Sequence, residues 1–325
     1  MSETLLEIKD LSVKYKTDLE TVCAVNGISL KLNKGETLGI VGETGAGKTT
    51  TALTLLKLLP ERVSFIDSGS VHFDGQEIIS LSEDEMENIR GSKISMIFQD
   101  PMTSLNPVHT VGRQILEVLR VHNNGERSKE DLDKRVDEVL ELVGIPATRK
   151  NDYPHQFSGG MKQRVVIAMA LACEPELLIA DEPTTALDVT IQAQVLNLMR
   201  SLRNRLGTSM LLITHDLGVV AQMCDKVAVM YAGEFVEVGT LADLFTGEKH
   251  HPYTQGLFGS VPKLDDESKS LLNPIDGLMP DPTNLPEGCS FSPRCPFASE
   301  MCKTKPKDVS LSDTHRVRCH LVEEK

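Results

Sequence analysis

The sequence has no long apolar run and no broad excess of basic residues. Among its 325 residues, no apolar stretch approaches the ~18–20 residues of a membrane-spanning helix, so a role at a membrane must depend on another chain. The first ten residues lack a basic region followed by an apolar core, so we expect no signal peptide and a cytoplasmic protein. Lys and Arg number 34 against 47 Asp and Glu, a formal net charge of −13, which argues against nucleic acid as the main partner.

The composition is otherwise that of an ordinary globular protein, with 40% hydrophobic and 25% charged residues. The length suits one large or two modest domains. Nine of the 16 prolines and four of the seven cysteines lie after residue 251, where we expect few long helices. We therefore predict a first domain at residues 1–247 and a small, irregular, Cys-rich domain at residues 248–325, which needs a staple because proline-rich loops bury little surface.

A glycine-rich loop at residues 42–50 follows an apolar run at 38–41 and precedes a helix-like segment at 51–59. Strand, glycine loop and helix in this order form the context of the G-x-x-x-x-G-K-[ST] phosphate loop, which binds a nucleoside triphosphate. Its backbone N–H groups and the following helix N-terminus favour an anion, Lys48 can reach the β- and γ-phosphates, and the Thr49 hydroxyl can bind Mg²⁺. The loop residues are Gly42, Glu43, Thr44, Gly45, Ala46, Gly47, Lys48, Thr49 and Thr50.

Short strands surround this loop, and a helical insertion follows it. We predict strands at residues 6–15 and 28–32, a hairpin at 69–79, helices at 111–122, 132–143, 161–172 and 191–206, and buried strands at 94–98, 177–180 and 210–213. The pattern indicates an α/β fold whose mixed sheet carries an antiparallel subdomain and a helical subdomain at about residues 104–172. Tyr15, on the first strand, either stacks on a nucleobase or is an ordinary strand residue.

Two acids follow the continuous apolar strand at residues 177–180. Ligands bind at the carboxyl ends of such strands, so Asp181 can hold Mg²⁺ through water, and Glu182 can polarise the water that attacks the γ-phosphate. His215 also follows a buried strand and could sense the γ-phosphate, although a lone His is more often structural.

Ser158, Gly159 and Gly160 precede a helix and offer a second anion site made of amides, a hydroxyl and a helix N-terminus. One nucleotide cannot need both sites from one chain, because the first already wraps its phosphates. We infer that this second site meets a nucleotide bound to another subunit, which predicts a dimer.

The ordered set of motifs resembles the nucleotide-binding domain of ABC transporters over residues 5–245. The resemblance rests on the phosphate loop, Gln99, the stretch Phe157 to Met161, Asp181-Glu182, Ala186-Leu187-Asp188 and His215. It implies that Gln99 senses Mg²⁺ and transmits to the membrane subunit, that Ser158 to Met161 form the signature loop, that Asp188 belongs to the D-loop, and that Tyr15 stacks on adenine. The signature departs from the usual Leu-Ser-Gly-Gly-Gln at Phe157 and Met161.

A narrower resemblance, to the oligopeptide, dipeptide and nickel importer branch, extends over nearly the whole chain. It is carried by residues 98–107, by residues 251–257 and by the C-terminal cysteine pattern. It implies an ATPase that powers peptide import, with ATP and Mg²⁺ as ligands. The implied partners are a second ABC subunit, expected to be a paralogue, two transmembrane permease subunits and, indirectly, an extracytoplasmic solute-binding protein. The chain would then lie at the cytoplasmic face of the membrane as a peripheral protein.

The four C-terminal cysteines, Cys289, Cys295, Cys302 and Cys319, are separated by five, six and sixteen residues. Disulfides are disfavoured in the cytosol, so a metal is the better interpretation, although the spacing fits neither zinc ribbons nor ferredoxins. Similar cysteine sets in the resembled family hold a [4Fe–4S] cluster, which we predict here, with zinc or unligated thiols as the alternatives.

Other functions compete with peptide import. Nickel import is one, because the same branch includes nickel importers. ABC proteins of DNA repair usually insert a long coiled coil before the signature, but only 110 residues separate Gly47 from Ser158, with no sustained heptad repeat. Ribosome-associated ABC factors carry two cassettes per chain, whereas this sequence has one phosphate loop.

Overall fold

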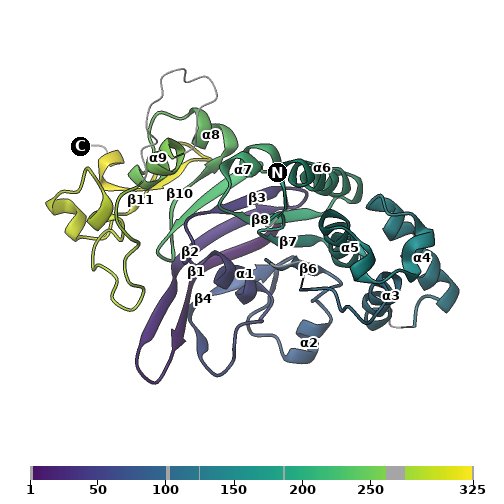
Figure 1. The fold of residues 1–325 in the computed structure, drawn as a ribbon. Helices are drawn as coiled ribbons and strands as arrows, with labels where there is room; N and C mark the ends of the chain where they lie inside the picture. The colour runs from purple at the N-terminus through teal and green to yellow at the C-terminus, as the bar shows by residue number, and fades with distance from the viewer. Residues whose placement is uncertain (1–2, 100–102, 124, 186, 261–274, 324–325) are drawn as a thin grey trace, which may run out of the picture. The chain divides into compact units, whose positions relative to one another are not determined.

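The structure, a computed structural model, describes residues 3–99, 103–123, 125–185, 187–260 and 275–323. The chain divides into two compact units, each assembled from separate stretches of sequence. The first unit comprises Met1–Thr4, Leu32–Thr37 and Ser80–Ile213, and the second comprises Leu5–Lys31, Leu38–Ile79 and Thr214–Lys325. Figure 1 shows the elements of both along the chain.

Three parallel strands form the sheet of the first unit. In β7 (Leu177–Asp181) every residue is buried, as the continuous apolar run predicts, and β7 pairs with β6 (Ile94–Ile97) on one side and β8 (Ser209–Thr214) on the other. Because parallel strands end at one edge of a sheet, the segments after β6 and β7 emerge together. This edge holds the polar residues that the sequence singled out.

Helices precede and follow these strands along the chain of the first unit, and α3 to α5 form the helical insertion (Figure 1). Most begin at a side-chain cap: Thr110 caps α3, Ser128 and Asp131 form a capping box on α4, and Asp188 caps α6, which ends at left-handed Gly207. The helices are α2 (Glu83–Glu87), α3 (Val111–Val121), α4 (Lys129–Leu142), α5 (Gly159–Leu171) and α6 (Val189–Leu206), with 3-10 turns η1 (Ala147–Asn151) and η2 (Pro154–Gln156).

The second unit contains a four-stranded sheet in the order β2-β1-β4-β5. Its strands are β1 (Thr4–Lys16), β2 (Thr21–Asn33), β4 (Ser64–Phe73) and β5 (Gln76–Glu77). The pairs β1–β4 and β4–β5 are antiparallel, and Asp74 and Gly75, both at positive φ, form the turn of the predicted hairpin. This sheet matches the antiparallel subdomain expected from the sequence.

A mixed sheet in the same unit places β9 between β3 and β10. The strand β9 (Lys226–Tyr231) runs parallel to β3 (Thr37–Val41) and antiparallel to β10 (Glu234–Thr240). The helices of this unit are α1 (Lys48–Leu55), α7 (Leu217–Met223), α8 (Leu241–Thr246), which Thr240 caps, and α9 (Pro252–Gly259).

The C-terminal residues continue this mixed sheet. In β12 (Arg316–Arg318), Val317 pairs with Glu237 of β10, and β11 (Asp308–Ser310) pairs with β12. Val317, Cys319 and Val322 form a small apolar cluster against Val309 and Leu311. The remaining turns are η3 (Ser292–Arg294), η4 (Glu300–Lys303) and η5 (His320–Val322). Strand pairing thus crosses the boundary predicted near residue 247, and that boundary stays a prediction.

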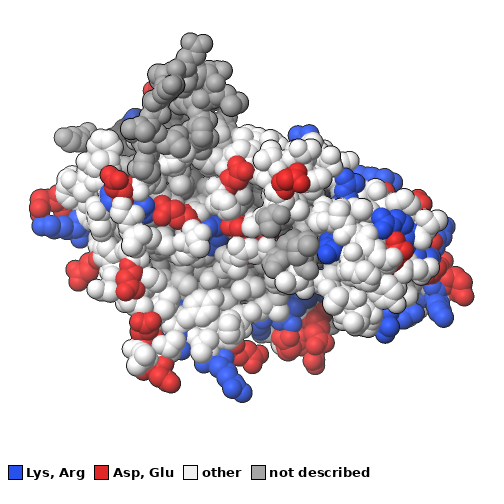
Figure 2. Space-filling view, viewed as in Figure 1, with Lys and Arg blue, Asp and Glu red and all other residues white. Residues whose placement is uncertain are grey.

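Helix length and surface charge bear on function. Over the described residues, no helix is long and apolar enough to cross a membrane. On the face that Figure 2 shows, acidic and basic side chains lie among one another, in keeping with a sequence that lacks a broad basic footprint.

Candidate active site

The phosphate loop lies between β3 and α1 in the second unit, as the sequence predicts. Glycine is required at two of its positions because the backbone of neighbouring segments comes too close for a side chain. A Cβ on Gly42 would lie 2.1 Å from the Met230 carbonyl oxygen, and one on Gly47 would lie 2.3 Å from that of Ala24. Gly47 also caps α1 with a φ of 103°, a left-handed conformation that favours glycine. The loop is therefore a backbone cradle at a helix N-terminus, which fits the phosphates of a nucleotide.

Lys48 is folded back over this loop. The residue is only 6% exposed. Its ammonium group donates to the carbonyl oxygens of Gly42 at 2.8 Å and Glu43 at 2.9 Å. These bonds hold the positive charge of Lys48 at the loop. Thr49, the predicted magnesium ligand, is exposed on the first turn of α1.

Tyr15 lies beside the first turn of α1. Its hydroxyl is 3.2 Å from the Thr50 hydroxyl, and the side chain is half-buried on β1. A base-stacking role for Tyr15 stays a prediction, but the contact holds its ring next to the phosphate loop. His215 follows β8 and is exposed, and the next residue, Asp216, caps α7 by accepting from the N–H groups of Gly218 and Val219.

The C-terminal segment braces the phosphate loop through Glu43. The Arg294 guanidinium, 5% exposed, contacts the Glu43 carboxylate at 3.0 Å, and the Glu43 N–H donates to the Tyr253 hydroxyl at 2.9 Å. Tyr253, Tyr231 and Phe291 pack their rings against one another with centroids 4.6–5.5 Å apart. Burial raises the pKa of Tyr253 well above its usual range, so this hydroxyl stays protonated. Sequence reasoning missed Arg294 and Tyr253 as loop supports, because their partner lies more than 200 positions away.

In the first unit, Gln99 and Glu182 come together at the edge of the sheet. The Gln99 amide donates to a Glu182 carboxylate oxygen at 3.2 Å, and the Thr185 hydroxyl donates to the same oxygen at 3.0 Å. Glu182 follows β7 directly, with a φ of 47°. Its neighbour Asp181 is 1% exposed. The structure thus joins two residues that are 83 positions apart: Glu182, which the sequence predicts to polarise water, and Gln99, which the resemblance implies as a Mg²⁺ sensor.

Gln163 of α5 supports the chain just after Glu182. This fully buried side chain donates through its amide to the Pro183 carbonyl oxygen. Because α5 begins at the predicted signature loop, one helix carries both that loop and the support for the acidic segment. Nothing in the sequence pattern marks Gln163, since a polar residue on a helix is usually solvated.

Ser158 caps α5 by accepting from the Met161 N–H at 3.4 Å, and Ser158 itself is exposed. A Cβ on Gly159 would meet nothing within 4 Å, whereas one on Gly160 would lie 2.5 Å from the Ile191 side chain. The signature loop therefore has an open face at Gly159 and a packed face at Gly160. Asp188 caps α6 through the Ile191 N–H at 3.0 Å.

Arg149 joins the two residues at which the signature departs from its usual form. Its guanidinium lies 4.2 Å from the ring centroid of buried Phe157 and contacts the Met161 sulfur at 3.6 Å. Arg149 also pairs with Asp152 at 2.7 Å. Phe157 and Met161 are thus part of one packed cluster with Arg149, which supports the signature loop.

Comparisons with known proteins agree with this geometry. The ABC transporter family profile matches residues 25–185. The chain is 52% identical to the oligopeptide transport ATP-binding protein OppD of Bacillus subtilis, over 98% of this chain and 89% of the relative. It is 51% identical to the dipeptide transport ATP-binding protein DppD of the same organism, over 99% of this chain and 96% of the relative.

This chain belongs to the ABC transporter family. A second profile, the oligopeptide/dipeptide transporter C-terminal region, matches residues 236–302. A dimeric ATP-binding cassette, MJ0796, solved in a post-hydrolysis state with ADP and Pi, is 30% identical with a TM-score of 0.65, over 73% of this chain and 98% of that one. The cbiO1 protein of Clostridium perfringens gives the same identity and TM-score, over 75% and 91%. The chain is an ABC-type ATPase with a P-loop cassette of mixed sheet and helices.

The prediction of a [4Fe–4S] cluster is wrong. The matches place the chain in a family of ATP-binding proteins with which an iron–sulfur centre conflicts. The structure describes all four C-terminal cysteines, and none of them forms a disulfide. Burial raises the pKa of Cys289 to about 11 and also raises those of Cys295 and Cys319. The resemblance misled the sequence argument, because a cysteine can also serve as a small packing residue, as Cys319 does beside Val317.

Proposed function

We propose that this chain is the ATP-hydrolysing subunit that powers import of dipeptides or oligopeptides through a partner membrane permease. The observation that carries the substrate class is the similarity over nearly the whole chain to two peptide-transport ATP-binding proteins, including the C-terminal region at residues 236–302. The cassette alone is shared with other ABC ATPases and does not indicate a substrate. The C-terminal region therefore decides between branches of the family.

The phosphate loop would bind the nucleotide. Its glycine-based cradle, the Lys48 ammonium group and the N-terminus of α1 all favour phosphate oxygens. Thr49 in the second unit, and Asp181 and Gln99 in the first, carry the hydroxyl, carboxylate and amide oxygens that suit Mg²⁺. When bound, Mg²⁺ supplies positive charge that neutralises the phosphate oxygens.

Glu182 would orient and polarise the attacking water. The hydrogen bonds from Gln99 and Thr185 go to one of its oxygens, Oε2, and hold the carboxylate in a fixed direction. A carboxylate held in this way can accept a proton from water at the moment of attack. His215, exposed after β8, would contact the γ-phosphate.

The open face at Gly159 supports a dimer in which Ser158, Gly159 and Gly160 meet the nucleotide of a second cassette. Asp188, the cap of α6, would belong to the D-loop of this dimer. We expect that cassette to be a paralogue. Two transmembrane permease subunits and, indirectly, an extracytoplasmic solute-binding protein would complete the importer. This ABC ATPase would then act as a peripheral subunit at the cytoplasmic face of the membrane.

Substitution Glu182→Gln tests the catalytic assignment. We expect ATP binding to persist while turnover falls by about 10²-fold or more, because the amide cannot take the proton. The exposed acid Glu176, which precedes β7, provides the matched control Glu176→Gln with turnover unchanged. Steady-state phosphate release and ATP titration measure both effects. Hydrolysis by Glu182→Gln at the rate of the intact protein would contradict the assignment.

Isolation of the complex tests the transport assignment. The tagged chain, recovered from detergent-solubilised membranes, should bring two membrane subunits with it. After reconstitution in vesicles, that complex should take up labelled peptides with ATP and the solute-binding protein. Uptake of nickel instead would identify the alternative importer, and recovery with ribosomes or DNA would identify a different class of ABC protein.

A further inference from the structure

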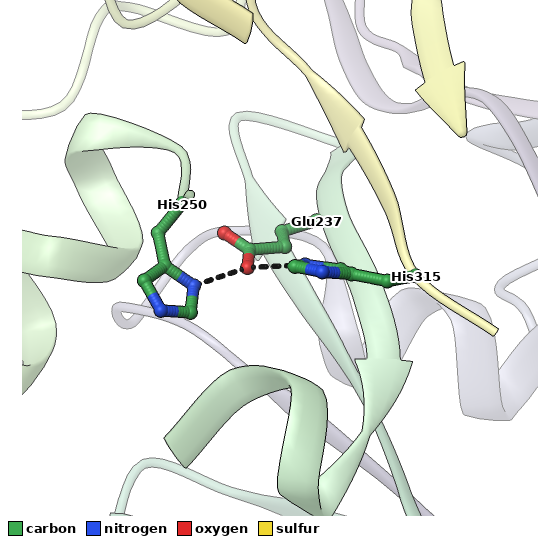
Figure 3. Close-up of side chains that lie close together, drawn as sticks. All are labelled: Glu237, His250 and His315. Atoms are coloured by element: carbon green, nitrogen blue, oxygen red, sulfur yellow. Dashed lines mark hydrogen bonds and ion pairs between the residues drawn. The ribbon is translucent and has the colours of Figure 1, made fainter. Parts of the chain in front are cut away.

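A buried carboxylate in the second unit faces two imidazole rings (Figure 3). Glu237 of β10 has a fully buried side chain, and its Oε1 lies 2.7 Å from His250 Nδ1 and 2.9 Å from His315 Nε2. The two histidine side chains are 12% and 7% exposed. Within the described residues, these three are the group of His, Cys, Asp or Glu side chains whose ligand atoms lie close enough, within 4.8 Å, to share one ion.

The hydrogen bonds of His250 require a proton or a metal ion between its ring and Glu237. Its other ring nitrogen, Nε2, lies 2.9 Å from the Gly247 carbonyl oxygen, which can only accept, so Nε2 carries the proton. In a neutral ring Nδ1 then has a lone pair, which points at the Glu237 carboxylate. Two lone pairs do not approach to 2.7 Å without a cation between or on them. Either a second proton or a metal ion supplies that charge.

The surroundings of the cluster match a metal site. A histidine that ligates a metal almost always donates its other N–H to a carbonyl or carboxylate, as His250 does to Gly247. The second oxygen of Glu237 accepts from the His251 N–H at 2.8 Å, which fixes the carboxylate. His315 also borders a hollow of about 710 Å³, lined in addition by Glu248, Lys249 and Glu323, which gives an ion a way in.

We propose that Glu237, His250 and His315 bind a zinc ion through Oε1, Nδ1 and Nε2. Two imidazole nitrogens and a carboxylate oxygen are ligands that zinc takes at about 2.0–2.2 Å, with water completing a tetrahedron. Such bonds separate ligand atoms by roughly 3.3 Å, so the side chains must move apart by about half an ångström from their present contacts. The site is separate from the phosphate loop, from the acids after β7 and from the four C-terminal cysteines.

The ion would join three segments that are distant in sequence. Glu237 lies on β10, His250 between α8 and α9, and His315 just before β12. Zinc at this point would fasten the C-terminal strands to the sheet that they extend. Its effect on stability is independent of the proposed transport function.

Zinc binding by the full chain tests the proposal. Protein stripped with a chelator is dialysed against zinc and analysed for metal, and its melting temperature is measured with and without zinc. The variants Glu237→Gln and His315→Gln should bind one zinc fewer per chain than the unmodified protein, or bind it at least 10-fold more weakly. Zinc should raise the melting temperature of the unmodified protein but not that of the variants.

His320 provides a matched control. Its Nε2 lies 3.0 Å from the Thr304 carbonyl oxygen and its Nδ1 lies 3.3 Å from the Glu323 carboxylate, so it repeats the arrangement of His250 without a second imidazole. His320→Gln should bind zinc as the unmodified protein does. Where His315→Gln does not fold, His250→Gln, whose side chain is the more exposed of the two, replaces it.

Equal zinc content and equal melting shifts in all variants would overturn the proposal, because any bound zinc would then lie on other residues. A chelator-stripped protein that takes up no zinc would also overturn it, and would leave a proton shared between Glu237 and His250 as the explanation of their contact.

Discussion

Glu182 has a left-handed backbone conformation, with a φ of 47°, that an acidic residue adopts at a cost of about 1–3 kcal/mol. The structure compensates in several places. The Glu182 N–H donates to the Ile213 carbonyl oxygen at 2.8 Å, and the side chain accepts from Gln99 and Thr185. A conformation that is strained and yet held by several bonds is typical of a functional position. The unfavourable backbone conformation of Glu182 is therefore tolerated at a position where the carboxylate is held in place.

Tyr15 offers a test of base recognition by a single side chain. Stacking of a base on an aromatic ring contributes ~1–3 kcal/mol, so Tyr15→Ala should weaken ATP binding roughly 5- to 150-fold. Tyr15→Phe is the control, because it keeps the ring and removes only the contact with the Thr50 hydroxyl. Nucleotide titration by calorimetry measures both. If Tyr15→Ala binds ATP as tightly as the unmodified chain, Tyr15 is an ordinary strand residue.

The phosphate loop, as an element, depends on segments from the far end of the chain. Its Glu43 is held by Arg294 and Tyr253. On β2, the Cys23 N–H donates to the Pro282 carbonyl oxygen at 2.9 Å. The Met279 side chain lies 3.1 Å from where a Cβ on Gly45 would be. Residues 253, 279, 282 and 294 therefore help to shape the nucleotide-binding element, which the sequence assigns to the cassette alone.

Substitution Arg294→Met should loosen this element. Hydrogen bonds to charged groups contribute about 1.5–3 kcal/mol, and the change leaves Glu43 without its ion pair, so we expect a melting temperature lower by several degrees and weaker ATP binding. Lys303→Met is the control, since Lys303 forms an exposed pair with Glu300 that should contribute little. Differential scanning calorimetry and ATP titration give both results. Equal effects of the two substitutions would show that Arg294 does not support the loop.

Local pattern predicted the elements well, because each depends on neighbouring residues. The apolar run at residues 177–180, the cap at Thr240 and the Asp74-Gly75 turn all have signals within a few positions. The side chains that support the site depend instead on contacts between positions farther apart in sequence. Examples are the Arg149 guanidinium on the Phe157 ring and the Gln163 amide that donates to the Pro183 carbonyl oxygen. Residue type alone did not reveal them. The four C-terminal cysteines show the converse error, because the cluster prediction rested on a resemblance, whereas Cys319 packs against Val317.

As a whole molecule, this ABC ATPase has two candidate anion-binding surfaces of different character. In the phosphate loop, Lys48 folds back onto the backbone and the glycines are closely packed. In the signature loop, Ser158 is exposed and a Cβ on Gly159 would meet nothing within 4 Å. An exposed helix N-terminus with no side chain over it suits a ligand held by another molecule. The isolated chain should therefore be a monomer and a poor ATPase, and light scattering that reveals a stable dimer without nucleotide would contradict this.

Gly159→Asp tests this surface directly, because the structure separates its effect on folding from its effect on assembly. Nothing lies within 4 Å of the Cβ position, and an acid in the first turn of a helix is favourable, so the isolated variant should melt at or above the temperature of the unmodified chain. In the complex with the partner cassette, the new carboxylate would face the phosphates of the other subunit and repel them. We expect at least a 10-fold loss of ATPase activity there, with ATP binding by the isolated variant unchanged, and a much smaller loss for Gly159→Ala. Phosphate release by the purified complex is the decisive measurement, and full activity of Gly159→Asp in that complex would show that the signature loop does not meet a nucleotide.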